Sequence, residues 1–551
     1  MRRVHRQQGW VSVMALTAMT VLVLICLGVS SMALQNVTRS QQDQRAMLAF
    51  QAAQAGLDYE ISQAYGRLTG SGGFRSNARE LEEDLADIAP GATGTVEVTP
   101  TSDAKIAWVT STATLNGVTK SVRSMLYSRN VGIWNNAIFG GTGAAGRSIN
   151  GNVDIRGSVH CLGEGEYYSD LNGNGRWDAA ESFTDRNRNG VWDPGEAFVD
   201  ANGDGVWSSA EPFNDTNRNG SYDPPLTETD LNSTMGGTAY IGNNYSGMPA
   251  DLEALVPAAP RINNIEQLGT EVRVKHGRVS ISGSATIGSN SIIDGGLSKN
   301  TVDGVFVSDG FTGNQGASSV FSDNGTSNSY DLSHLGIKFP VLSGLGAEQY
   351  RDPSGTVWNN HEEYLDARSL TVPVTLIKAS TTAFSYGPDA YGNSISFTPA
   401  SGGTPATLNV TGIIRFAGDL QIGAKDTIRY RGTGTLFGEG NINIDGNLLP
   451  LSGMTFPTTT RIGVIAKQNL NLATGNGSSQ LSMAGAFYAQ GRIVSAKQNQ
   501  IAGTFVANFF DLGTNVPNIY QVPALTDNMP PAMPGDKNYF SLKVRTWRER
   551  E

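Results

Sequence analysis

The chain opens with a short basic segment and then a long stretch that carries no charged side chain. Residues 1–8 read MRRVHRQQ, Gly9 follows, and the 25 residues from Trp10 to Leu34 contain no Asp, Glu, Lys or Arg. At ~1.5 Å rise per residue, a helix of this stretch is roughly 37 Å long and crosses a ~30 Å hydrocarbon core with some tilt. The arginines lie on one side only, which predicts a single-pass membrane helix with the bulk of the chain outside the cytoplasm.

The apolar stretch has a second interpretation, a cleaved secretory signal with Ser31–Met32–Ala33 as its cleavage site. Signal cores usually span about 7 to 15 residues, and this stretch is longer. Helical periodicity also continues past Leu34, because apolar residues recur three or four positions apart at Met47, Phe50, Ala53, Leu57 and Ile61. The sequence therefore predicts one helix over residues 10–67, half in lipid and half amphipathic.

This pattern resembles the amino-terminal domain of type IV minor pilins of the PilX-like class. The likeness rests on the basic leader, Gly9, the unbroken apolar helix and the segment AFQAAQAGL at residues 49–57. The resemblance implies that a prepilin peptidase cleaves after Gly9 and methylates Trp10. It also implies that the chain passes from the inner membrane to an extracellular pilus, where its helix contacts other pilins.

Two residues depart from the pattern of most pilins. Trp10 is an unusual first residue, and Met14 occupies the fifth mature position, where most pilins carry glutamate. That carboxylate is thought to neutralise the terminal amine of the next subunit toward the tip, since an unpaired charge in an apolar core is costly. A subunit with nothing ahead of it needs no such partner, so Met14 predicts a tip subunit. The alternative is an anchor that never enters a filament.

Composition predicts a β-rich exported molecule. Glycine accounts for 66 of 551 residues and proline for only 22, which excludes collagen and a proline-rich linker. The two cysteines, Cys26 in the predicted membrane helix and Cys161 far outside it, cannot form a disulfide with each other. The chain therefore needs another source of stability.

A repeat of 15 residues between residues 170 and 229 offers that source. Its copies read DLNGNGRWDAAESFT, DRNRNGVWDPGEAFV, DANGDGVWSSAEPFN and DTNRNGSYDPPLTET. They match the EF-hand loop pattern of alternating oxygen donors, a turn glycine and a glutamate at the twelfth position, which predicts three Ca²⁺ sites and a fourth that lacks the glutamate. The candidate ligands are Asp170, Asn172, Asn174, the Arg176 carbonyl, Asp178 and Glu181 in the first loop; Asp185, Asn187, Asn189, the Val191 carbonyl, Asp193 and Glu196 in the second; Asp200, Asn202, Asp204, the Val206 carbonyl, Ser208 and Glu211 in the third; and Asp215, Asn217, Asn219 and Asp223 in the fourth.

Spacing decides what kind of calcium module this is. Only three residues separate consecutive loops, so no helices flank them, and we expect tandem loops stacked on one another. The fourth loop has Leu226 in place of glutamate and is expected to bind weakly or to borrow Glu228 or an outside carboxylate. Aromatic residues recur at the eighth and fourteenth positions, which argues against a disordered acidic linker. Calcium as a structural staple is preferred to calcium as a regulator, because exported modules bind at ~10⁻⁴ to 10⁻³ M and stay loaded outside cells.

The remaining sequence predicts β-structure. Alternating runs at residues 95–128, with a turn at Asn116–Gly117, predict an antiparallel sheet packed on the helix. Glycine-punctuated rungs near Gly412, Gly434, Gly463, Gly485 and Gly503 predict a β-solenoid, with a β-sandwich as the alternative. The fold class is an α+β pilin with a large inserted all-β domain. Its expected segments are a leader (1–9), the helix (10–67), a head sheet (68–137), the start of the solenoid (138–169), the calcium loops (170–225), the rest of the solenoid (226–520), and a linker with a strand that returns to the head sheet (521–551).

The charge distribution leaves room for a nucleic-acid partner. From Glu164 to Asp223 there are 13 acidic residues and four arginines, a net charge of −9 out of −10 for the whole chain. The remainder is nearly neutral, and basic residues on successive rungs could align as a ladder that contacts double-stranded DNA phosphates without sequence preference. The candidates are Arg273, Lys275, Arg278, Arg429, Arg431, Arg461, Lys467, Arg492 and Lys497.

A pilin that carries a solenoid also resembles the competence-associated minor pilin proposed as a DNA receptor at the pilus tip in naturally transformable bacteria. This resemblance implies DNA uptake, and an adhesin that binds a glycan or a surface is the alternative. An enzyme is disfavoured, because outside the calcium loops the sequence shows no carboxylate cluster with a basic residue and its five histidines lack metal-ligand spacing.

Overall fold

The computed structural model places most of the chain in two compact units. The first unit comprises residues 1–130 and 540–551, and the second comprises residues 131–539. The structure describes residues 7–68, 72–81, 85, 88–102, 104–143, 150–151, 153–201, 203, 205–216, 218–225, 236–262, 264–275, 283–289, 305–307, 336–512, 517–535 and 539–550.

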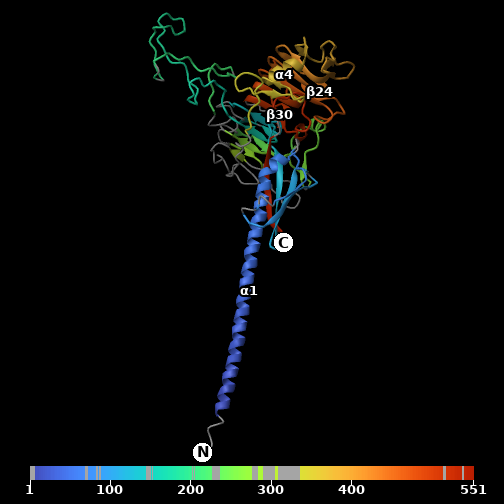
Figure 1. Cartoon of the computed structure of the whole chain (residues 1–551). Coiled ribbons are helices and arrows are strands. Elements are labelled where there is room, and N and C mark those ends of the chain that lie inside the picture. The colour runs from blue at the N-terminus through green and yellow to red at the C-terminus, as the bar shows by residue number, and fades with distance from the viewer. Residues whose placement is uncertain are drawn as a thin grey trace, which may run out of the picture. The chain divides into compact units, whose positions relative to one another are not determined.

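The first unit is built on one long helix. Helix α1 (Gln7–Gln63) has 57 residues and continues into the 3-10 turn η1 (Ala64–Arg67). Its first part is exposed and apolar, and among the described residues it is the one helix long and apolar enough to cross a membrane (Figure 1). Its last part buries a stripe at three- and four-residue spacing, formed by Ala49, Ala52, Ala53 and Leu57. The predicted long helix is present, with Gly9 and Trp10 inside α1.

An antiparallel sheet in the order β1-β2-β3-β4-β32 packs on this stripe. Asn116 (φ 49°) and Gly117 (φ 82°) form the turn that the sequence predicts between the third and fourth strands. The last strand pairs with the fourth, starting where Phe540 faces Asn130. The strands are β1 (Asn77–Glu80), β2 (Thr93–Pro100), β3 (Ile106–Leu115), β4 (Val118–Asn130) and β32 (Phe540–Arg550).

The second unit consists mainly of short parallel strands stacked in register. A central column joins β18 (Leu370–Val372), β22 (Ala406–Phe416), β24 (Thr427–Gly438), β27 (Arg461–Ala466), β29 (Ser482–Ser495) and β30 (Gln500–Asp511) (Figure 1). A second column joins β19 (Leu376–Ile377), β23 (Leu420–Ile422), β25 (Ile442–Ile444) and β28 (Leu470–Leu472), and β26 (Asn447–Pro450) lies between β24 and β29.

The glycines that marked the expected rungs lie close to one line across these strands. Gly412 pairs with Gly434, and Gly485 pairs with Gly503. The third rung differs by one position, because Gly434 pairs with Ile462 and not with Gly463. Side chains between the columns are buried in one continuous apolar core.

The chain enters this stack in its middle. Strand β5 (Ile138–Gly140) pairs with β30, and β8 (Val159–Cys161), β13 (Val272–Val274) and β15 (Val305–Val307) follow in parallel. In a parallel row beside them, β31 (Asn518–Tyr520), β7 (Asp154–Arg156), β10 (Tyr240–Gly242) and β14 (Thr286–Ile287) pair in turn.

Several smaller elements complete the second unit. Two of them, β20 (Phe384–Tyr386) and β21 (Ser394–Thr398), pair antiparallel at the edge of β22. The others are β6 (Asn150–Gly151), β9 (Gly236–Gly237), α3 (Ala250–Glu253), β11 (Arg261–Ile262), β12 (Ile265–Glu266), β16 (Tyr350–Arg351), β17 (Val357–Trp358), α4 (His361–Arg368) and η4 (Pro523–Leu525).

Candidate functional site

The four repeats form an antiparallel arm, which we define as residues 166–223. Its outgoing and return limbs run side by side (Figure 1). Near the base, the Ser169 amide donates to the Pro212 carbonyl at 2.8 Å, and further out the Thr184 amide donates to the Ala197 carbonyl at 2.8 Å. Among the described residues, loop 1 (170–181) and loop 3 (200–211) therefore face each other, loop 2 (185–196) closes the tip, and loop 4 (215–225) lies at the base. The sequence predicts tandem loops stacked on one another, and the structure arranges them as the two limbs of a hairpin.

Each loop is shaped around its first aspartate. In loop 1 the Asp170 carboxylate accepts hydrogen bonds from the amides of Gly173 at 2.6 Å, Asn174 at 3.1 Å and Gly175 at 2.8 Å. Gly175 adopts φ +75°, a conformation that a side chain disfavours, which is why glycine stands at the sixth position. The corresponding bonds recur at Asp185, Asp200 and Asp215.

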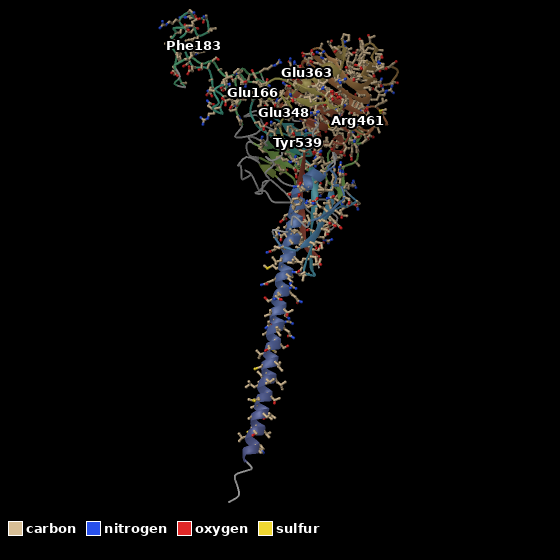
Figure 2. All side chains as sticks on the ribbon, in the orientation of Figure 1. Glu166, Phe183, Glu348, Glu363, Arg461 and Tyr539 are labelled. Atoms are coloured by element: carbon tan, nitrogen blue, oxygen red, sulfur yellow. The ribbon has the colours of Figure 1, made fainter. Side chains whose placement is uncertain are left out.

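Each loop is also closed by a glutamate whose two carboxylate oxygens accept backbone amides from the second and ninth loop positions. Only loop 2 uses its own glutamate. Loops 1 and 3 exchange theirs, and loop 4 takes one from upstream of the first repeat (Figure 2 labels this residue, Glu166). The pairs are Glu196 with Arg186 (2.7 Å) and Asp193 (3.1 Å), Glu211 with Leu171 (2.7 Å) and Asp178 (3.2 Å), Glu181 with Ala201 (2.7 Å) and Ser208 (3.0 Å), and Glu166 with Thr216 (2.7 Å) and Asp223 (3.2 Å).

These hydrogen bonds differ from the grouping expected from the sequence. The sequence placed Glu181 with loop 1 and Glu211 with loop 3, whereas Glu181 hydrogen-bonds to loop 3 and Glu211 to loop 1. Glu166, absent from the sequence-based list, is a carboxylate from outside loop 4 that accepts hydrogen bonds from that loop, and burial is the main cause that raises the pKa of its carboxyl. The signal was present in the sequence, because Glu166 lies 15 residues before Glu181 and so extends the glutamate series by one period. Glu228, Asn202, Asp204 and Asn217 lie outside the described residues.

The repeat aromatics join the limbs of the arm. Trp177 stacks on Tyr222 at 4.9 Å between ring centroids, and Trp192 stacks on Trp207 at 5.3 Å. The Trp177 indole of loop 1 donates to the backbone carbonyl of Glu211 in loop 3 at 2.8 Å, so the ring joins the same two loops as the Glu211 carboxylate. Each ring thus contacts a loop from another repeat.

The donor chemistry of the loops fits a hard divalent cation. The side chains that converge are carboxylates and amides, which offer the oxygen atoms that Ca²⁺ prefers. Among the described residues no three His, Cys, Asp or Glu side chains gather at one point, so a cation here would depend on asparagine and backbone oxygens as well. Asn172 and Asn174 now direct amide nitrogens to the Asp178 carboxylate, each at 2.6 Å, and a rotation of the amide would present oxygen instead.

The nine basic candidates do not form one ladder. Arg273 is buried and paired with Glu271, because its short strand is covered on both faces. Lys275 pairs with Glu164 and Lys467 with Glu362, while Arg492 lies 3.8 Å from Asp511. Arg278 lies outside the described residues.

Three arginines remain together on neighbouring rungs, and we call Arg429, Arg431 and Arg461 the arginine cluster. Arg429 donates to the Pro450 carbonyl at 3.0 Å, Arg431 to the Asn409 side chain, and Arg461 to the Thr433 hydroxyl at 3.4 Å. Within the described residues, none of the three pairs with a carboxylate. Lys497 is exposed elsewhere, on the loop between β29 and β30.

Sequence reasoning missed an aromatic and basic patch beside α4. The Arg368 guanidinium lies over the Tyr391 ring at 4.7 Å and over the Trp358 ring at 5.6 Å. Tyr391 is 56% exposed. No motif signals this patch, because its residues come from three separate segments.

A small cavity of about 110 Å³ lies next to this helix. His361 stacks on Tyr350 at 4.1 Å, donates a hydrogen bond from Nε2 to the Ala532 carbonyl at 3.0 Å, and has a pKa lowered by burial to about 4. Lys338 and Glu348 pair at 2.9 Å in the cavity lining. The cation and the carboxylate neutralise each other there.

Comparison with known proteins gives a likeness to a solved structure. No protein-family profile matches the chain, and no curated protein matches its sequence. The crystal structure of the competence-associated pilin ComZ from Thermus thermophilus is similar, with a TM-score of 0.50 and 17% identity over 92% of this chain and 97% of that one. At this identity the likeness concerns the fold. The long amino-terminal apolar helix with a large β-rich region is a pilin-like fold.

Proposed function

We propose that the chain is a minor type IV pilin of the PilX-like class, non-enzymatic, that is anchored in the inner membrane and then assembled at the tip of an extracellular pilus. The observation that carries the proposal is α1, whose first half is exposed and apolar while its second half packs under an antiparallel sheet. A plain membrane anchor needs only the first half. In the proposed role α1 contacts other pilins. Met14 offers no carboxylate to the terminal amine of a subunit ahead of it, which suits a subunit at the tip.

Processing provides the direct test. Prepilin peptidase is expected to cleave after Gly9, so that the mature chain begins with N-methylated Trp10. Mass spectrometry of the amino-terminal peptide from purified pili checks this, and Gly9→Val should leave the leader attached and the chain in the membrane. Recovery of an intact leader from the unaltered chain in pili would contradict the proposal, and labelling along the filament shaft would contradict the tip position.

We also propose that the second unit is a β-solenoid inserted in the pilin head, with its arm stapled by calcium. The in-register parallel columns support the solenoid, and the four loops with their bidentate glutamates support the calcium sites. A cation that binds only the folded arm stabilises it by about 2.7 kcal/mol per site at 100 times its Kd. Chelation should therefore lower the unfolding temperature of the arm, followed by tryptophan fluorescence, and an unchanged value would refute the staple.

For the tip ligand we propose double-stranded DNA, bound without sequence preference for uptake. The arginine cluster supports this, because its guanidinium groups lack carboxylate partners among the described residues and lie on adjacent rungs. Each phosphate contact contributes a slope of about −0.9 to the logarithmic salt dependence of binding. Arg431→Gln with Arg461→Gln should reduce that slope by about two, as measured by gel shift with unrelated duplexes.

The matched control removes two cations that already have carboxylate partners. Arg261 pairs with Glu266 and Lys338 pairs with Glu348, each at about the same exposure of the basic side chain, 58%. The double variant Arg261→Gln with Lys338→Gln should leave the slope nearly unchanged. Equal losses in both double variants, or no binding at low salt by the unaltered protein, would sink the proposal.

The alternative ligand is a glycan or a surface, which would make the protein a tip adhesin. The exposed Tyr391 ring above Arg368 favours it, because flat aromatic rings commonly contact sugars and other apolar faces. Tyr391→Ala should then abolish attachment of the piliated cell while DNA binding is retained.

A further inference from the structure

The four glutamate closures of the arm are nested around its tip. Glu196 closes loop 2 within the tip, Glu181 and Glu211 cross between the two limbs one step further in, and Glu166 closes loop 4 at the base. Every closure except the one at the tip joins residues of opposite limbs. A tandem array in which each loop is self-contained would have no such crossings.

The backbone shows the same exchange between loops 1 and 3. The Glu181 amide donates to the Ser208 carbonyl and the Glu211 amide donates to the Asp178 carbonyl, both at 3.0 Å. In loop 2 the equivalent bond stays inside the loop, from the Glu196 amide to the Asp193 carbonyl at 3.0 Å. Loops 1 and 3 therefore exchange this backbone bond, and loop 2, which keeps its own, serves as the comparison within the same arm.

We infer that loops 1 and 3 bind calcium as one interlocked pair, in which each ion takes its bidentate carboxylate from the opposite limb. This rests on the proposed calcium binding. Glu211 completes the site that begins at Asp170, and Glu181 completes the site that begins at Asp200. The two ions hold the outgoing and return limbs together, so calcium fixes the arm as a hairpin and not as a row of independent beads.

The loops differ in how much chain has to be ordered before their ligands come together. Loop 2 brings its ligands together within one short segment, so its closure entropy is small. Loops 1 and 3 have to align two limbs first, and their ligands are complete only when the backbone bonds near Thr184 and Ser169 have formed. Loop 2 is thus the local nucleus of the hairpin, and the interlocked pair extends it toward the base.

Counting bound calcium in paired variants tests this inference. The full-length chain in detergent is dialysed against calcium at a concentration that just saturates the unaltered protein, and bound metal is measured by mass spectrometry. Glu181→Gln should lose one ion. Adding Asp200→Asn, which affects the same interlocked site, should cause no further loss, whereas adding Asp170→Asn should cost a second ion.

Glu196→Gln is the matched control, because it makes the same chemical change in the loop that closes on itself. It should lose one ion, and its combination with Asp185→Asn should lose no more. If calcium binding at the two interlocked sites is cooperative, Glu181→Gln alone will lose both ions. The inference then stands if Glu196→Gln loses one ion only. It is overturned if Glu181→Gln and its combination with Asp170→Asn bind equally while the combination with Asp200→Asn binds less.

The experiment separates this inference from the proposal on which it rests. An unaltered chain that binds no calcium would refute calcium binding itself. A chain that binds calcium with losses following each loop's own glutamate would refute only the interlocking.

Discussion

The stacked strands of the second unit come so close at Gly503 that an added methyl group should be strongly destabilising. Gly503 has φ +145° and pairs with Gly485 on the neighbouring strand. A Cβ at this position would overlap the Gly485 carbonyl oxygen and lie 3.0 Å from its carbonyl carbon. Neither atom can yield without moving strand β29, because both belong to the backbone.

The size of the effect follows from two contributions. A non-glycine residue in this backbone conformation costs about 1–3 kcal/mol. Separating the strands costs at least one ladder hydrogen bond, about 1 kcal/mol, and a misfit in the packed core of about 1–3 kcal/mol. We therefore expect Gly503→Ala to lower the free energy of unfolding by about 3–7 kcal/mol.

Gly453→Ala is the control, because Gly453 also has positive φ, at +81°, but a Cβ there meets nothing within 4 Å. It should cost only the conformational strain, about 1–2 kcal/mol. The assay is denaturant unfolding of the full chain in detergent, followed by tyrosine and tryptophan fluorescence and far-ultraviolet circular dichroism. Equal shifts of the unfolding midpoint in the two variants would refute the close approach of the strands.

Two further substitutions probe other parts of the chain. Burial lowers the pKa of His361 from 6.5 to about 4, so between these pH values the unfolded chain binds a proton that the folded chain does not. The contribution of His361 to the free energy of unfolding is therefore complete above pH 6.5 and is lost as the pH decreases toward 4. Between pH 7 and pH 5 the loss of unfolding free energy from His361 amounts to about 2 kcal/mol. His361→Gln should remove this part of the pH dependence, measured by denaturant unfolding at a series of pH values, and should leave the part that buried His160 causes. Gly56→Leu should weaken the packing of α1 on its sheet by about 1–3 kcal/mol or more, because the new Cβ would lie 2.6 Å from the Ser111 hydroxyl and overlap Leu81. A Cβ at Gly66 meets nothing within 4 Å, so Gly66→Leu should be nearly neutral. Hydrogen exchange of the helix amides measures the difference, and equal protection in both variants would contradict the close contact.

The local structure of the arm could be predicted from the sequence, and its pairing could not. The 15-residue period fixes the first aspartate and the turn glycine of each loop, because the contact between them lies within a few residues. Which glutamate closes which loop depends on where the chain reverses. The periodic sequence permits a glutamate from the same loop or from a neighbour, and only the reversal at loop 2 selects Glu211 for the first loop.

The same distinction applies to the stacked strands and the basic residues. Glycine positions indicated the register between Gly412 and Gly434, since tight neighbouring strands need glycine at matching places. Nothing local indicates that β5 pairs with β30, which lies far along the chain. Arg273 was a candidate for the basic ladder, but its strand is covered on both sides and the guanidinium is paired with Glu271.

The ends of the second unit explain how the five-stranded sheet can accommodate so large an insertion, and they lead to a last prediction. Within the second unit the Val131 amide donates to the Tyr539 carbonyl at 2.6 Å, so its two ends lie side by side. Within the first unit Asn130 faces Phe540 across the pair β4 and β32, and the apolar cluster of this unit draws only on its own residues. Replacing residues 132–538 by a short glycine and serine turn should therefore leave a folded head, because it substitutes one hairpin connection for another. Circular dichroism and hydrogen exchange of β4 would show this, with a matched deletion that also removes β32 as the control. An unprotected β4 in the first variant, equal to that in the control, would mean that the head depends on the insertion for its fold.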